Sequence, residues 1–180
     1  MKRLWCLLIG LLPFGLSANE MKVPFSVPVD FSKKGTVYET DFQAPWNIWG
    51  SLVKFYILTD IAWKTTSSEE YKIYRYIYEG HPQEINSYFK LKVTLIPLGW
   101  ASNDITVWIG ELPRKEFKDG EKIEFEVSVP LYGRGFGKTI MIADLQRLRN
   151  YHIRVESLDN VELPKGVLTK FKINRYSTKH

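Results

Sequence analysis

A glycine-rich segment in the second half of the chain has the residue types of a phosphate-binding loop. The segment reads GRGFGKT at positions 133–139 and follows a predicted strand. A loop of this kind binds phosphate through successive backbone N–H groups, and the pattern GxxxxGK[ST] fixes the spacing of its glycines. That pattern requires a glycine at position 132, where the chain has Tyr132. The segment is therefore interpreted as a glycine-rich hairpin loop in a β-protein, and no cofactor is expected.

The acidic residues that cluster most closely in the sequence do not form a catalytic pair. Glu124 and Glu126 alternate with apolar residues in segment 122–129, so both are expected to face solvent. Nothing in the sequence places either one opposite a partner acid at the separation that a glycosidase requires. No GxSxG motif of a hydrolase is present either. The sequence predicts no catalytic residue and no enzyme, and an uncharacterised hydrolase stays the last alternative.

The histidines and the cysteine are too few and too scattered to predict a metal site. The chain has three histidines, His81, His152 and His180, and a single cysteine, Cys6. One cysteine excludes a disulfide within the chain and a zinc site built from several thiolates. No bound metal is expected, and His152 is interpreted as a surface histidine on a strand.

Aromatic and arginine side chains in loops are the candidates for contact with a partner. Tyr132, Arg134 and Phe136 lie in or beside the glycine-rich segment, and Trp46 and Trp49 lie in the loop-like stretch APWNIWG. Tyrosine, tryptophan and arginine contribute most of the binding energy at protein interfaces, and phenylalanine is also enriched there. Loop tryptophans can instead stack on sugar rings or be buried in the core. These five residues are the predicted partner-binding residues.

Basic residues gather in two stretches near the end of the chain, 147–154 and 165–179. They could form a surface for an acidic partner. However, Lys170 and Lys172 occupy the polar half of an alternating strand, where lysine commonly protects a sheet edge. The formal net charge is only +5, which does not favour nucleic acid as a partner.

The elements that must position these residues are mostly strands. Apolar and polar residues alternate, or an apolar run is continuous, in six segments: 37–42, 52–58, 88–96, 122–129, 151–157 and 168–174. Turn-forming residues such as Gly, Asp, Asn and Pro separate them. This spacing predicts a mainly β chain that forms a single antiparallel, immunoglobulin-like β-sandwich of about 7–9 strands with one or two short helices.

The inward rows of these strands predict the hydrophobic core. Trp108, inside the apolar stretch ITVWI, is also expected there. The residues predicted to be buried are Phe55, Ile57, Leu91, Val93, Leu95, Phe125, Val127, Ile153, Val155, Phe171 and Ile173.

Two further segments do not fit the strand pattern cleanly. Segment 67–79 opens with two serines and two glutamates and stops at Gly80, which favours a helix, although its isoleucines and tyrosines also suit a strand. Segment 139–149 fits either a short helix or a strand that enters a turn.

The first residues have the layout of a secretory signal peptide. Lys2 and Arg3 precede an apolar run, and small residues follow near Ala18, so cleavage is expected after residue 18. The apolar run is too short for a transmembrane helix, which needs about 20 residues. The expected mature protein is one domain, residues 19–180, in the periplasm or secreted, with no membrane span.

Two stretches of the mature chain resemble a known family. They are FSVPVDFSKKGTVYETDF at 25–42, and YHIRVESL at 151–158 followed by LPKGVLTKFKI at 163–173. Together they are similar to an uncharacterised family of small exported Gram-negative proteins, a domain of unknown function with an expected β-sandwich. The resemblance implies no catalytic residues.

These observations lead to three function hypotheses. The first is an exported, non-catalytic protein-binding module, with a periplasmic immunity or inhibitor protein against a secreted toxin as its most concrete form. The toxin or an envelope protein would then be the partner. The second is a carbohydrate- or envelope-binding module, and the third is the hydrolase already named.

Overall fold

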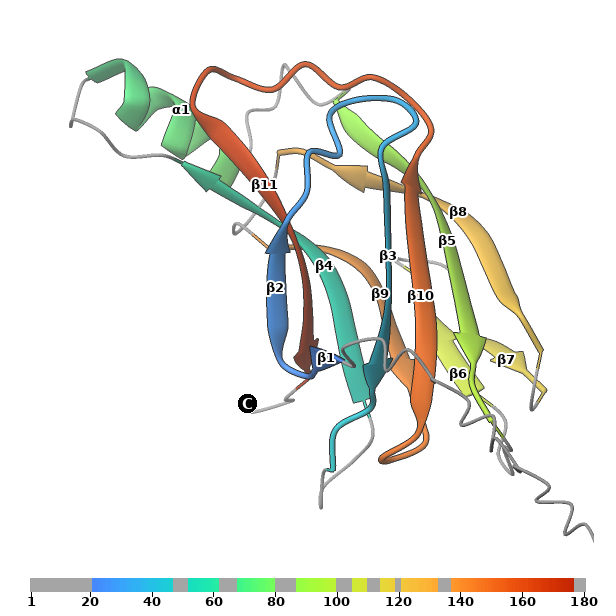
Figure 1. Cartoon of the computed structure of the whole chain (residues 1–180). Coiled ribbons are helices and arrows are strands. Elements are labelled where there is room, and N and C mark those ends of the chain that lie inside the picture. The colour runs from blue at the N-terminus through green and yellow to red at the C-terminus, as the bar shows by residue number, and fades with distance from the viewer. Residues whose placement is uncertain are drawn as a thin grey trace, which may run out of the picture.

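The strand-forming segments fold into two β-sheets that lie face to face (Figure 1). The computed structural model describes residues 21–46, 52–61, 68–79, 87–99, 105–109, 114–118, 121–132 and 137–176. Within these residues there are eleven strands and one helix.

The two sheets hold five and six strands. Sheet A has the order β1 (Met21–Lys22), β3 (Val37–Gln43), β10 (Asn150–Ser157), β5 (Tyr88–Pro97) and β8 (Ile123–Pro130). Sheet B has the order β2 (Phe25–Pro28), β11 (Val167–Arg175), β4 (Leu52–Ile61), β9 (Gly137–Asp144), β6 (Ile105–Trp108) and β7 (Lys115–Phe117).

The fold is a mainly β sandwich, as the sequence predicts, but it has more strands than expected. The additional strands β1, β2, β6 and β7 are only two to four residues long. An alternating pattern cannot be recognised in so few residues, so sequence periodicity missed them. The strand pairs are antiparallel except for the short β1–β3 pair, which is parallel.

Successive strands almost always lie in opposite sheets. Among the described strands, only β6 and β7 follow one another within a single sheet. The glycine-rich segment therefore connects β8 of sheet A to β9 of sheet B. β8 and β9 do not pair with each other, so the predicted hairpin loop is wrong; residues 133–136 between them lie outside the described residues. Segment 139–149, which was open between helix and strand, begins within β9.

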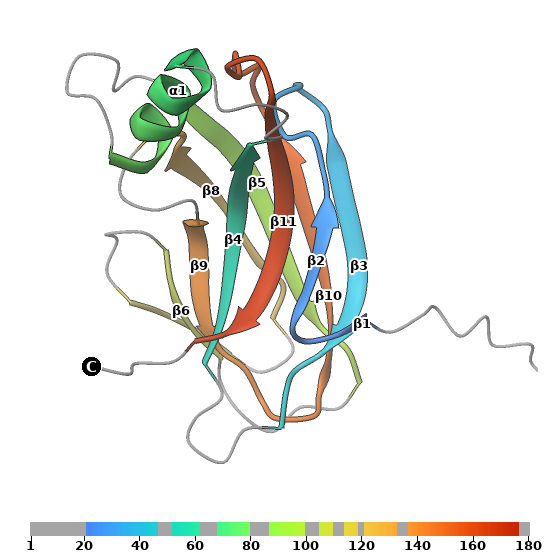
Figure 2. The ribbon, with the colours of Figure 1, turned by 90° about the vertical axis from the view of Figure 1, so that its left-hand side faces the viewer.

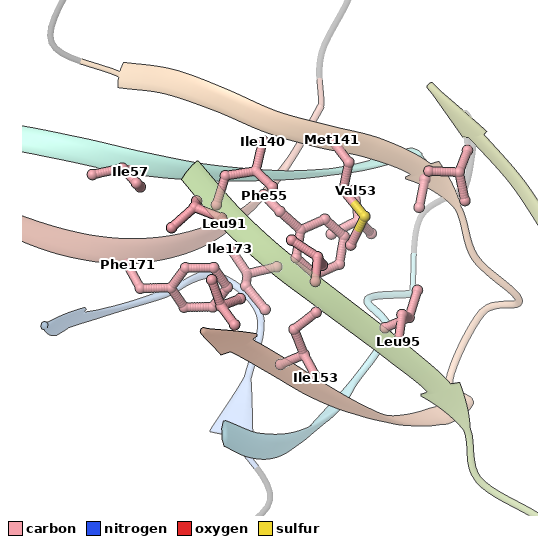
Figure 3. Close-up of a cluster of buried hydrophobic side chains, with 14 of the residues drawn as sticks. Val53, Phe55, Ile57, Leu91, Leu95, Ile140, Met141, Ile153, Phe171 and Ile173 are labelled. Atoms are coloured by element: carbon pink, nitrogen blue, oxygen red, sulfur yellow. The ribbon is translucent and has the colours of Figure 1, made fainter. Parts of the chain in front are cut away.

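Apolar side chains from both sheets meet between the layers (Figure 3). Strand β10 alternates buried and half-buried residues along its whole length, as expected for a strand with one inward face. Nine of the eleven predicted core residues are fully buried: Phe55, Ile57, Leu91, Val93, Leu95, Ile153, Val155, Phe171 and Ile173.

Three residues predicted to be in the core are only half-buried. Phe125 and Val127 point inward, but β8 is the outermost strand of sheet A, so the core covers these side chains on one side only. Trp108 pairs with Ile142 and lies on the outer face of sheet B, with the guanidinium of Arg114 5.9 Å from its ring centroid. In that stretch the core residue is its neighbour Val107, which is completely buried.

Residues 68–79 of segment 67–79 form a helix, α1 (Ser68–Glu79), at one end of the sandwich (Figure 2). Its Ile77 is fully buried and belongs to a small cluster with Val167. The helix has no basic residue in its last turn. Instead Lys138, from strand β9, donates a hydrogen bond of 3.2 Å to the carbonyl oxygen of Ile77. A cation at this position interacts favourably with the carbonyl end of the helix dipole. No helix among the described residues has the length and apolar character to cross a membrane.

Lys138 is only 5% exposed, so its charge is desolvated. This burial lowers the pKa of Lys138 from the usual 10.5 to about 8.

We predict that phenylalanine truncations at a central and an edge strand have different costs. Phe55→Ala on β4 removes a fully buried ring and should lower the free energy of unfolding by about 3–5 kcal/mol. Phe125→Ala on edge strand β8 removes a half-buried ring and should cost roughly half as much. Urea denaturation of the two variants measures the difference. Equal losses would contradict the edge position of β8.

We also predict a pH dependence of stability that originates at Lys138. Because the pKa of this lysine is lower in the folded than in the unfolded chain, its protonated form opposes folding. The free energy of unfolding should therefore gain up to about 3 kcal/mol from this residue as pH rises from about 8 to 10.5. Lys138→Met removes this contribution, so the stability difference between the two proteins should change over that range. A constant difference in urea denaturation across these pH values would contradict the prediction.

Candidate functional site

The five predicted partner-binding residues have different surroundings. Tyr132 is half-buried and packs against both the main core and the small cluster beneath α1. Its position indicates a structural role. Arg134, Phe136 and Trp49 lie outside the described residues, so they stay predictions. Trp46 is 58% exposed, and it is the predicted residue around which a site can be built.

Trp46 comes shortly after β3 and belongs to a surface at the end of the sandwich where β3 ends and β10 begins, away from α1 (the lower end in Figure 1). Two segments form it, and we call them together the Trp46 corner: residues 44–46, which follow β3, and residues 145–149, which connect β9 to β10. The guanidinium of Arg147 lies 6.0 Å from the centroid of the Trp46 ring, at the limit for a cation–π contact. Leu148 is 49% exposed beside them. The corner thus presents a tryptophan, an arginine and a leucine to solvent.

Backbone hydrogen bonds join the two segments of the Trp46 corner. The N–H of Ala44 donates to the carbonyl of Arg149 at 2.8 Å, and the N–H of Leu148 donates to the carbonyl of Ala44 at 3.1 Å. The N–H of Gln146 donates to the hydroxyl of the fully buried Tyr151 at 2.9 Å. These bonds hold the exposed side chains on a fixed backbone. A preformed surface loses less conformational entropy when it binds.

A buried arginine connects the corner to a third loop. Arg149 is 7% exposed, and its guanidinium lies 5.6 Å from the ring centroid of Tyr151. It donates to the carbonyl oxygens of Leu98 at 3.4 Å and Gly99 at 3.3 Å. In the sequence, Arg149 lies in a basic stretch that could form a surface for an acidic partner. The structure shows that it supports the loops from inside.

Two features of the corner depart from the most stable local arrangement. Leu148 has a positive φ of 57°, which places a bulky side chain in the left-handed region. Among the described residues, the buried Oε1 of Gln146 has no hydrogen-bond partner. Each departure typically costs of order 1–3 kcal/mol, and such departures are concentrated at functional sites. They distinguish this corner from an ordinary turn.

A second candidate surface is a shallow polar groove of about 410 Å³ on the outer face of sheet A. Cross-strand register places Glu39, Arg154, Thr94 and Glu124 in one row across four strands. Arg154 contacts Glu39 at 2.9 Å, so the row is internally paired.

The other ionisable groups of this groove are paired as well. His152 lies 2.7 Å from Asp41, so it is a paired histidine on the strand surface. Glu124 and Glu126 face solvent, as predicted. Hydrogen bonds from Lys122 and Lys92 lower the pKa of Glu124 to about 2. The charges on this face already neutralise one another.

Among the described residues, no group of three or more His, Cys, Asp and Glu side chains is arranged as a metal site would require. The Trp46 corner is the candidate functional site because it gathers exposed tryptophan, arginine and leucine side chains on a hydrogen-bonded backbone. Its exposed side chains can make apolar, cation–π and hydrogen-bond contacts.

Comparison with known proteins adds the fold and nothing about activity. No family model and no curated protein matches the chain. A solved structure described as "Crystal Structure of GEBA250068378 from Sulfurospirillum deleyianum" is similar over 86% of this chain and 98% of that one. Its TM-score is 0.58 and the sequence identity is 12%. At this identity the similarity shows the fold alone, and the family resemblance predicted from the sequence stays a prediction.

We predict that replacing Leu148 by glycine stabilises the protein. Glycine adopts a positive φ without the steric cost that leucine has, while the half-exposed side chain contributes little burial. Leu148→Gly should raise the free energy of unfolding by up to about 1 kcal/mol. Leu148→Ala is the matched control, since it removes the side chain but keeps Cβ, and it should give no increase. Thermal denaturation measures the stability of both variants. A glycine variant less stable than wild type would contradict the interpretation that the backbone of Leu148 is strained.

Proposed function

We propose that this protein is a non-catalytic module that binds another protein through the Trp46 corner. Its most concrete form is a periplasmic immunity or inhibitor protein against a secreted toxin. An envelope protein is the other kind of partner. The observation that carries the proposal is the joint exposure of Trp46, Arg147 and Leu148 on a hydrogen-bonded corner.

The composition and rigidity of the corner support protein binding. Tryptophan and arginine dominate binding hot spots, where a few side chains carry most of the affinity. Leu148 adds an apolar contact next to them. Leu148 is half-exposed on this backbone, so a partner that covers it would gain from the burial of apolar surface.

The proposal includes the location and the finer fold type. Residues 1–18 would direct export and be removed, so the module would act in the periplasm or outside the cell. An immunoglobulin-like form belongs to the same proposal. The mainly antiparallel pairing and the repeated crossings between sheets are compatible with it.

A carbohydrate- or envelope-binding module is the second candidate function. The observation that favours it is the 58% exposure of Trp46, because an exposed indole can stack on a sugar ring. Arg147 beside the ring could donate hydrogen bonds to sugar hydroxyls. Binding to glycan polymers rather than to a protein would separate the two functions.

We predict that the double variant Trp46→Ala/Leu148→Ala loses the partner. Wild-type protein, immobilised and exposed to a periplasmic extract of the producing bacterium, should retain a specific protein that can be purified and titrated. Removal of a hot-spot pair should weaken that binding by about 2–4 kcal/mol, which is roughly a 30- to 1,000-fold rise in Kd. The melting temperature should change little, since both side chains are exposed.

The matched control is Tyr71→Ala/Leu168→Ala. It also removes an exposed aromatic and an exposed leucine, with 62% and 54% exposure, but from α1 and β11. The control should bind as wild type does. If both double variants bind the partner with equal affinity, the Trp46 corner is not the binding site. Retention of peptidoglycan or another glycan polymer in place of a protein would favour the second function.

A further inference from the structure

The outer face of sheet B presents two lysines beside an aromatic ring, on a face that also carries the acids Asp60 and Asp144. Figure 2 looks onto this face, and below α1 no described helix or strand crosses in front of β4 and β11. On β4, Lys54 and Tyr56 flank the buried Phe55 and therefore point outward. Register places Lys172 of β11 directly opposite Tyr56, and Ile142 of β9 opposite Lys54. Leu58 follows two residues after Tyr56. We call these five side chains the Tyr56 face.

Tyr56 lies at the centre of this face and is held there by its neighbours. A Cβ at position 137 would lie 3.2 Å from the Tyr56 ring, so the ring rests closely on Gly137 of β9. The ammonium groups of Lys54 and Lys172 lie 5.3 Å and 5.8 Å from the ring centroid. Both distances are within the range of cation–π contacts. One aromatic ring thus holds two cations on the surface.

These two lysines differ from the other cations nearby. Lys170 pairs with Asp60 at 2.7 Å, and Arg114 pairs with Glu116. For Lys54 and Lys172 the described residues supply no acidic partner. Two like charges beside one ring repel each other. An anionic group from another molecule would therefore gain from both charges without breaking an existing ion pair.

The number of free charges indicates the class of anion. Attachment to anionic lipids supplies only about 1 kcal/mol per basic residue, and proteins that bind nucleic acid commonly make about 6–10 phosphate contacts. Two lysines are too few for either. Tyr56, Leu58 and Ile142 are half-buried apolar surface between the charges, and lipid headgroups or phosphates would leave that surface without a counterpart. A protein surface with acidic groups around apolar side chains matches both features.

We propose that the Tyr56 face is a second docking surface and that its partner is an acidic protein surface with an apolar centre. Carboxylates of that partner would contact Lys54 and Lys172, and its apolar side chains would cover Tyr56 and Leu58. This surface shares no residue with the Trp46 corner. A variant that loses binding at one surface therefore leaves binding at the other surface unchanged.

The test uses a random copolymer of glutamate and tyrosine as the probe, with poly-glutamate and anionic phosphatidylglycerol vesicles as comparisons. The purified protein should bind the copolymer more tightly than poly-glutamate at low ionic strength, and added salt should weaken both. Lys54→Ala/Lys172→Ala should weaken binding of the copolymer roughly tenfold, the loss expected for two surface ion pairs.

The matched control removes the same charge from the other sheet. Lys90→Ala/Lys122→Ala takes two paired lysines from the outer face of sheet A. Its affinity should stay within about twofold of wild type, since those lysines already have acidic partners. Equal losses in both variants would mean that net charge alone drives binding, and the proposal would fail. Tighter binding to the vesicles than to the copolymer would also overturn it, because the partner would then be a membrane. Circular dichroism confirms that both variants are folded.

Discussion

The ring and hydroxyl of Tyr151 connect the hydrophobic core to the exposed end of the molecule. The ring stacks on Phe42, 5.8 Å away, and Phe42 meets Phe55 of the opposite sheet edge-on at 5.7 Å. The hydroxyl accepts a hydrogen bond from the N–H of Gln146, and Arg149 lies over the ring. Both sheets and the Trp46 corner therefore depend on one buried side chain. A tyrosine suits this place because it combines a large apolar body with one polar group.

The two outer faces differ because cross-strand register pairs their side chains differently. On sheet A, register brings Arg154 beside Glu39, and Lys92 lies 3.1 Å from Glu124, so opposite charges are matched. On sheet B, Lys172 stands opposite Tyr56, and its ammonium lies 5.8 Å from the centroid of that ring. The charges on sheet A are matched in ion pairs, whereas on sheet B Lys170 is paired with Asp60 but Lys54 and Lys172 have no acidic partner among the described residues. This difference is the reason to expect a partner on sheet B rather than on the groove of sheet A.

At the end of the sandwich that carries α1, a tertiary contact supplies the cation that the last turn of the helix lacks. The helix lacks a basic residue in its last turn, and Lys138 contacts it from β9. Lys138 follows a glycine-rich segment that has the residue types of a phosphate-binding loop but not its glycine spacing. The structure places this side chain against the carbonyl of Ile77, where it contacts the helix and is buried. A lysine after a glycine-rich segment can therefore have a structural role, here as a buried donor to the end of a helix.

Much of the fold could be read from the sequence, because strand periodicity is a local property. Alternation identified the long strands and nine core residues, and the serines and glutamates before an apolar run favoured helix α1. The sequence also identified Trp46 as a candidate contact. It could not show that β8 is an edge strand, so Phe125 and Val127 were expected to be buried. Strand order depends on contacts between residues far apart in the chain, and local patterns do not encode it. For the same reason, only the tertiary structure joined Trp46 to Arg147 and Leu148, placed Arg149 inside, and gathered Lys54, Tyr56 and Lys172 on one face.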